Sequence, residues 1–366
     1  MGPRQSKLLK NQLSKPIEAA NHAEFTNLDF ANSRDDFQPA SPKSMSSAPP
    51  LNATGSIKTL PAPHIDKLQA KVWNPNSADS WDADMRGYHS VEESDYALPS
   101  DEIEQNRLET QHYLLRAMFN GDIVCSEVKE LVKKAGTKVL DVGCAKGFWL
   151  DSVRKEYPLS EYYGVDIAES LATEASPEHN VTIKFGNVLE GLPCDNFQHE
   201  DNTFDYTHQR LLVFGMPKEK YPEALKELIR VTKAGGWIEL IEVDIMAYKA
   251  GPYSKQLSQA MLGAMQARGL DCYAATNLEW HARDVRAHIS NQQIKTVHLP
   301  FNDNTNLGRL SGPNSKNVFL ALEDWMHKAM GVSREEFREL VENCFVEWAE
   351  YKTFWQVRAL YFQVKK

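Results

Sequence analysis

The sequence predicts an α/β protein with a mostly parallel sheet and helices on both of its faces. From residue 138 onward, short apolar runs of strand character alternate with segments of helical periodicity. This alternation is typical of right-handed βαβ units, whose strands lie parallel in one sheet. A turn with two glycines follows the first apolar run at residues 143–147, where a strand should give way to a helix. Glycine lets the backbone turn tightly and approach a ligand closely, so we expect a binding site there.

The expected elements follow one another in a regular order. A first helix begins at Ser100, whose hydroxyl can cap it. Five strands are predicted at 139–142, 161–167, 181–186, 204–209 and 237–243, with helices at 148–157 and 222–231 and a short helix ahead of the third strand. The fifth strand follows a Gly235-Gly236 turn. Two helical segments (251–290 and 318–351) and two strands (294–301 and 354–364) could then complete the sheet.

The first 70 residues have a different composition from the rest. Pro, Ser, Asn and Ala dominate residues 1–70 without any periodicity, so we predict a disordered tail there and a single domain over residues 71–366. The first residues fit the loose N-myristoylation pattern at Gly2, but Pro3 is a poor neighbour for the acceptor glycine. No apolar run reaches the roughly 20 residues that cross a bilayer. We therefore expect an unmodified tail and no attachment to a membrane.

Charge and cysteine content exclude several functional classes. The net charge is −9, and the excess acid lies after residue 75, so we expect no direct binding of nucleic acid. The five cysteines form no CxxC pair. An odd, unpaired set of this kind argues against a disulfide framework and against a cysteine metal site, and it favours a reducing, intracellular setting. The cytoplasm is the default location, and the nucleus stays open as an alternative.

Four features lie at matching positions along the predicted sheet. Asp141, Gly143 and Gly147 form the turn after the first strand, and Asp166 ends the second strand 25 residues after Asp141. An acid at that place in a dinucleotide-binding fold accepts hydrogen bonds from both ribose hydroxyls. Asn187 closes the third strand, where a small polar side chain can contact an adenine edge. The fourth strand ends in the polar run His208-Gln209-Arg210.

This ordered set resembles the class I S-adenosylmethionine-dependent methyltransferases over residues 138–245, and more loosely over 72–366. The step Lys233–Trp237 looks like the turn before the fifth strand of that family. The resemblance implies a Rossmann-like sheet with an antiparallel edge strand, S-adenosyl-L-methionine as cofactor, and methyl transfer as the activity. Several residues before the sheet look like fungal methyltransferases that act in, or regulate, secondary metabolism and development: Trp73, residues 95–101, Glu104, Arg107 and His112.

The resemblance also implies roles for individual residues. Gly143, Cys144 and Gly147 would form the loop under the methionine part of the cofactor. Asp141 would hold its ammonium group, directly or through water, while Asp166 would take the ribose hydroxyls and Asn187 with Val188 would face the adenine. His208 would be a general base, although a lone histidine at a strand end is more often a packed polar residue. The family pattern has a third glycine where this chain has Ala145. We expect this alanine to constrain the loop modestly.

The methyl acceptor stays open between a small molecule and a protein. We expect residues 72–119 and 245–330 to build the acceptor pocket, with 246–366 forming a lid and the last strands. A second interpretation is a methyltransferase-like regulatory protein that acts by binding a partner. A nicotinamide dehydrogenase is disfavoured because its G-x-G-x-x-G pattern is missing: after Gly143 the next glycine comes four places on.

Overall fold

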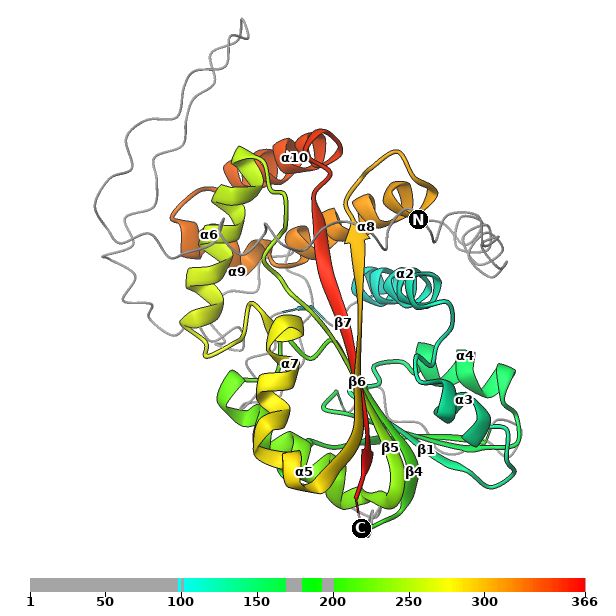
Figure 1. Cartoon of the computed structure of the whole chain (residues 1–366). Coiled ribbons are helices and arrows are strands. Elements are labelled where there is room, and N and C mark those ends of the chain that lie inside the picture. The colour runs from blue at the N-terminus through cyan, green and yellow to red at the C-terminus, as the bar shows by residue number, and fades with distance from the viewer. Residues whose placement is uncertain (1–97, 100–101, 169–179, 193–200, 366) are drawn as a thin grey trace, which may run out of the picture.

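A computed structural model of the chain describes residues 98–99, 102–168, 180–192 and 201–365 (Figure 1). The predicted tail at 1–70, the start of order near Val72 and the short helix ahead of the third strand all lie outside these described residues. Among the described helices, none is long and apolar enough to cross a membrane.

One mixed seven-stranded sheet organises the described chain, in the order β3-β2-β1-β4-β5-β7-β6. Its strands are β1 (Lys138–Val142), β2 (Glu161–Asp166), β3 (Val181–Phe185), β4 (Phe204–Arg210), β5 (Thr232–Val243), β6 (Ile289–Pro300) and β7 (Phe354–Val364). The first five strands pair in parallel, while β7 runs antiparallel to both β5 and β6. The predicted fold, mostly parallel with antiparallel pairing at one side, is confirmed.

Helices cover both faces of the sheet and one of its ends. The described helices are α2 (Glu102–Phe119), α3 (Ser126–Leu131), α4 (Phe148–Glu156), α5 (Tyr221–Val231), α6 (Pro252–Gln266), α7 (Ala274–His281), α8 (Asn306–Ala321), α9 (Glu323–Met330) and α10 (Arg334–Tyr351). Figure 1 shows α3 and α4 on one face and α5 and α7 on the other. The helices α2, α6, α8, α9 and α10 gather beyond the carboxyl ends of the parallel strands and form a cap (Figure 1).

The apolar core follows this layering. Strand side chains alternate between faces, so Val139 packs in one cluster with Trp149 of α4 and Leu140 packs in another with Leu225 of α5. A third cluster fills the cap and includes Met261, Met265 and Met330. The fold therefore has two face cores and one cap core, with the ligand edge of the sheet between them.

The differences from the predicted elements have local causes. Strand β5 begins at Thr232 and runs through the expected glycine turn, because Gly235 adopts φ +83° and the pairing with β4 shifts register there. The helical segment predicted at 318–351 is three helices. The first starts earlier, at Asn306, and a break at Gly331, in the left-handed region at φ +67°, separates the second from the third.

Candidate functional site

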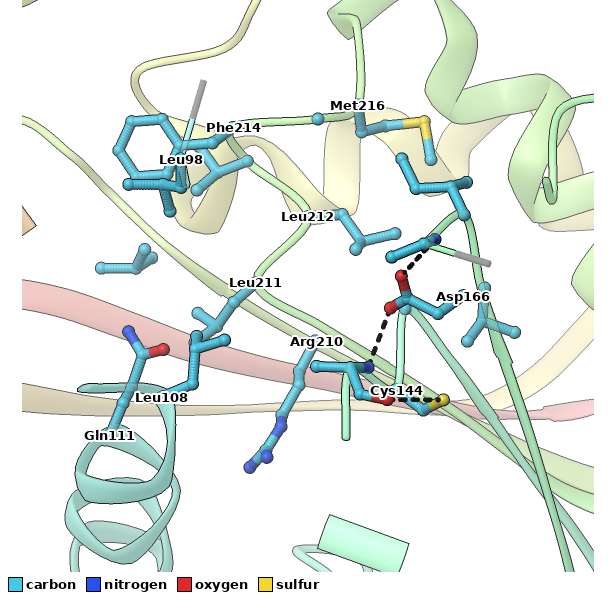
Figure 2. Close-up of a pocket in the computed structure, with 18 of the residues that line it drawn as sticks. Leu98, Leu108, Gln111, Cys144, Asp166, Arg210, Leu211, Leu212, Phe214 and Met216 are labelled. Carbon is cyan, nitrogen blue, oxygen red and sulfur yellow. Dashed lines mark hydrogen bonds between the residues drawn. The ribbon is translucent and has the colours of Figure 1, made fainter. Parts of the chain in front are cut away.

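The site lies where the strand order reverses direction. From β1 the chain moves outward through β2 and β3, then returns to place β4 on the other side of β1. In open α/β sheets the crevice outside the carboxyl ends of such neighbouring strands is the usual ligand position. A cavity of about 250 Å³ opens there. Its walls include residues 143–145 after β1, 166–168 after β2, 186–189 after β3 and 210–217 after β4 (Figure 2).

The loop after β1 brings bare backbone to the cavity. Gly143 has φ +71°, and a Cβ there would lie 2.5 Å from Leu212 Cδ2. Gly147 has φ +75°, and a Cβ there would lie 2.8 Å from Ile183 Cδ1. Ala145 has φ +49°, so the residue that departs from the family glycine is itself held in the left-handed region. The loop therefore takes the glycine conformation at three positions, one of which carries an alanine.

Asp166 anchors this loop from the end of β2. Its Oδ2 accepts from the backbone N–H of Ala145 at 2.8 Å and its Oδ1 accepts from that of Ala168 at 3.0 Å (Figure 2). Burial raises the pKa of the Asp166 carboxyl. The backbone of Ile167 also hydrogen-bonds this carboxyl. A carboxylate has about four acceptor positions, so one remains for a ligand. The structure brings Asp166 to the cavity wall, as the sequence predicts.

Asn187 and Val188 also reach the cavity wall, on the turn after β3. The Asn187 side chain is engaged within that turn: Oδ1 accepts from Leu189 N at 3.0 Å and Nδ2 donates to Glu190 Oε1 at 2.8 Å. Asn187 therefore shapes the turn, and Val188 supplies an apolar surface. Their predicted contact with an adenine stays a prediction.

Asp141 and His208 contact each other behind the cavity wall, and their predicted roles as ammonium ligand and general base stay predictions. They are direct neighbours on β1 and β4, and His208 Nδ1 lies 2.8 Å from Asp141 Oδ1. Both side chains are buried, and neither lines the described cavity. The His208 ring stacks on Trp149 with ring centroids 3.9 Å apart. The structure therefore supports the packed-polar interpretation of His208, and the predicted roles as general base and ammonium ligand gain no geometric support.

The polar residue that does reach the cavity from β4 is Arg210. Figure 2 shows its side chain directed away from Asp166, toward α2. There its Nη1 lies 3.3 Å from His112 Nδ1. Burial lowers the pKa of His112 well below its usual value, with smaller contributions from the cations Arg210 and Arg116. His112 is therefore neutral and accepts the hydrogen bond from Arg210.

The other side of the cavity is an apolar chamber beneath the cap. Its apolar walls come from α2, the ends of β5, β6 and β7, and the cap: Leu98, Leu108, Leu114, Leu115, Phe214, Val243, Ile245, Leu270, Leu299, Val318, Trp355 and Val357. Most of these positions fall in the segments predicted to build the acceptor pocket. Trp355 packs in the cap cluster and also lines the chamber. The methionines Met261, Met265 and Met330 are core residues of the same cluster and are not among the lining residues.

Of the polar residues of α2 that line this cavity, the resemblance to fungal methyltransferases includes Arg107 but not Gln105 or Gln111. Gln105, Arg107 and Gln111 line the cavity. Arg107 and Gln111 are four positions apart and share one face of the helix, whereas Gln105 projects from another side. The sequence predicts the helix, but it does not show which other segments of the chain the polar residues of the helix face.

Residues 139–236 match the methyltransferase domain family. The match covers β1 through the start of β5 and includes the glycine loop, Asp166, the β3 turn and the end of β4. The match covers less than half of the chain and shows that residues 139–236 are similar to methyltransferase domains. This confirms the family expected from the sequence, and the donor used by that class is S-adenosyl-L-methionine.

Several curated relatives of the methyltransferase domain are fungal proteins. The N-methyltransferase sirN of Leptosphaeria maculans is 31% identical over 155 residues, which cover 42% of this chain and 52% of that relative. The secondary metabolism regulator laeA of Coprinopsis cinerea is 29% identical over 227 residues, covering 57% of this chain and 53% of that relative. The chain thus spans about half the length of these relatives. The expected likeness to fungal methyltransferases is confirmed.

Solved structures that resemble the chain include other methyltransferases. A Haemonchus contortus phosphoethanolamine N-methyltransferase in complex with S-adenosyl-L-methionine aligns with TM-score 0.39 and 15% identity, covering 70% of this chain and 57% of that one. A putative sarcosine dimethylglycine methyltransferase from Galdieria sulphuraria aligns with TM-score 0.38 and 16% identity, covering 71% and 88%.

Proposed function

We propose that the chain is an S-adenosyl-L-methionine-dependent methyltransferase that acts on a small molecule held in the apolar chamber. The observation that carries the proposal is a cavity with two chemically different ends. Asp166 and the glycine loop form a polar end, and the chamber beneath the cap forms an apolar end. A donor seated at the polar end would present its reactive group to an acceptor at the apolar end.

The residues at the polar end fit this donor. The carboxylate of Asp166 keeps an acceptor position for a ribose hydroxyl, after its bonds to the backbone of Ala145, Ile167 and Ala168. A Cβ at Gly143 would clash with Leu212, so glycine fits best at this position of the loop. Val188 offers an apolar contact for a flat base. A nucleoside with a short polar tail requires these three features: an acid for the ribose, an apolar surface for the base and a tight loop beside the tail.

The bound donor would supply an electrophilic methyl group on a sulfonium, which an acceptor nucleophile can displace in line. The chain's own contribution is then position and exclusion of water. The glycine loop and Asp166 fix the nucleoside, the apolar walls orient the acceptor, and the cap covers both. Proximity of this kind accounts for a large part of catalysis when the electrophile is already activated. No side-chain base is required for an acceptor that is already deprotonated or carries a neutral lone pair.

Isothermal titration calorimetry with S-adenosyl-L-methionine and S-adenosylhomocysteine tests the donor site. The wild-type chain should bind each at one saturable site. Asp166→Ala should weaken binding roughly 10- to 100-fold, because a hydrogen bond to a charged acceptor is lost. The matched control is Asp284→Ala, which removes an exposed surface acid. Absence of binding by the wild type, or equal affinity of the Asp166→Ala variant, would contradict the proposal.

A regulatory role through partner binding is the second candidate, and the similarity to laeA favours it. Both candidates share donor binding, so only methyl transfer separates them. If Asp166→Ala abolishes methyl transfer to a defined acceptor but leaves the cellular phenotype that depends on the protein unchanged, partner binding is the function. Loss of both together supports the enzyme.

A further inference from the structure

Among the described residues, the charged side chains that line the cavity are unevenly placed. Of the described residues that line the cavity, Asp166 alone carries a carboxylate, and it lies at the donor end on backbone N–H groups. Two guanidinium groups, from Arg107 and Arg210, line the same cavity. The acceptor end therefore offers cations and no described acid.

Arg107 is already neutralised by a neighbour on its own helix. Its Nε lies 2.9 Å from both oxygens of Glu104, and its Nη2 lies 2.6 Å from Glu104 Oε1. The remaining nitrogen, Nη1, is buried and has no hydrogen-bond partner among the described residues. A buried donor without an acceptor is costly, so this nitrogen favours a ligand that brings an oxygen.

Arg210 carries a charge that no described carboxylate contacts. Its contact, His112, is neutral, and two acids of neighbouring elements are engaged with other partners. Asp122 pairs with Arg116, and Asp141 bonds to His208. Asp141 still acts on Arg210 at a distance and raises its pKa, against a larger lowering by burial. A guanidinium remains protonated throughout the physiological range.

We propose that the methyl acceptor is a small, mainly apolar molecule with a carboxylate or similar anionic oxygen group that pairs with Arg210. Protonated amines, including lysine and arginine side chains of proteins, are disfavoured because they would enter a chamber that already holds a cation, Arg210, which no described carboxylate contacts. This inference rests on the proposed methyltransferase function and names the acceptor class for that same site.

The anionic group at Arg210 has two sources, the acceptor and the carboxylate of the donor's methionine part. The direction of the side chain favours the acceptor, because Arg210 turns away from Asp166 and toward α2 (Figure 2). Gln111 and Leu108 lie on that helix beside the chamber (Figure 2). The experiment below separates the two sources by measuring them independently.

The test uses two probes of matched length, 4-phenylbutyrate and 4-phenylbutylamine, titrated by calorimetry into the full chain saturated with S-adenosylhomocysteine at pH 7.5. The wild type should bind the carboxylate at least tenfold more tightly than the amine. Arg210→Met should abolish this preference, Arg210→Lys should retain most of it, and the exposed control Arg286→Met should leave it unchanged. Affinity for S-adenosylhomocysteine should change less than threefold in all three variants, which also shows that they fold.

Each failure has a separate meaning. If S-adenosylhomocysteine does not bind the wild type, the proposed function itself fails. If it binds but the amine binds as well as the carboxylate, or the carboxylate does not bind, the acceptor class is wrong. If Arg210→Met weakens S-adenosylhomocysteine tenfold or more and leaves the probe preference intact, Arg210 holds the donor and the inference is overturned.

Discussion

The Nδ1 atom of His208 lies 2.8 Å from Oδ1 of Asp141, across the pairing of β4 with β1. Trp149 covers the imidazole by stacking, with ring planes 2° apart. The pair thus joins the two strands beneath the ligand crevice while both side chains stay away from the cavity. Its function is to hold the switch point of the sheet together.

His208→Ala should therefore act on stability. The change leaves a buried carboxylate without its partner and removes the ring that packs on Trp149. Removing one member of a buried pair costs about 3 kcal/mol or more, which urea unfolding would measure. The exposed His288→Ala is the matched control. A loss below about 1 kcal/mol together with loss of methyl transfer would show that His208 is a catalytic base instead.

The left-handed conformation of Ala145 predicts opposite responses to two substitutions. Ala145→Gly should change the unfolding free energy by less than about 1 kcal/mol, because relief of strain offsets the added entropy of the unfolded chain. Ala145→Val should cost about 1–3 kcal/mol, since a β-branched residue rarely adopts φ near +49°. Thermal and urea unfolding compare the two. Equal effects of glycine and valine would contradict this view of the loop.

Glu242 on β5 predicts a dependence of stability on pH. Its Oε1 accepts from the Tyr221 hydroxyl and from Leu212 N, and burial raises the pKa of the carboxyl from 4.5 to about 7. Between pH 4.5 and about 7, Glu242 keeps its proton in the folded chain but has released it in the unfolded chain. The Glu242 contribution therefore stabilises the fold fully below pH 4.5 and is lost as pH rises toward 7, a change of about 3 kcal/mol.

Unfolding of wild type and Glu242→Gln from pH 4.5 to 7.5 isolates this group, because other titrating residues are common to both chains. Glutamine mimics the protonated carboxyl, so the stability of the variant relative to wild type should rise steadily over the interval. Parallel curves for the two chains would show that Glu242 titrates normally.

The strand pattern, the glycine loop and Asp166 could all be predicted from the sequence because each depends on local chemistry. Apolar runs, φ freedom and the position of an acid at a strand end are properties of a few consecutive residues. The structure adds that Ala145 adopts the glycine conformation without being glycine, since the bonds from Ala145 and Ala168 to Asp166 hold the loop there.

The relations between distant segments could not be predicted. His208 stands beside Asp141 only because β4 pairs with β1, and residue type alone did not reveal that register. Arg210 meets His112 across 98 positions of sequence. The chamber combines α2 with the ends of β5, β6 and β7, so its charge balance became visible only when these elements were assembled.

Transfer of a radiolabelled methyl group from S-adenosyl-L-methionine into cell extract tests the central claim most directly. After separation of small molecules from macromolecules, the wild-type chain should place the label in the small-molecule fraction, in an acidic product, and Asp166→Ala should transfer at least tenfold less. Label confined to protein or nucleic acid, or no transfer by a wild-type chain that binds the donor, would contradict the account.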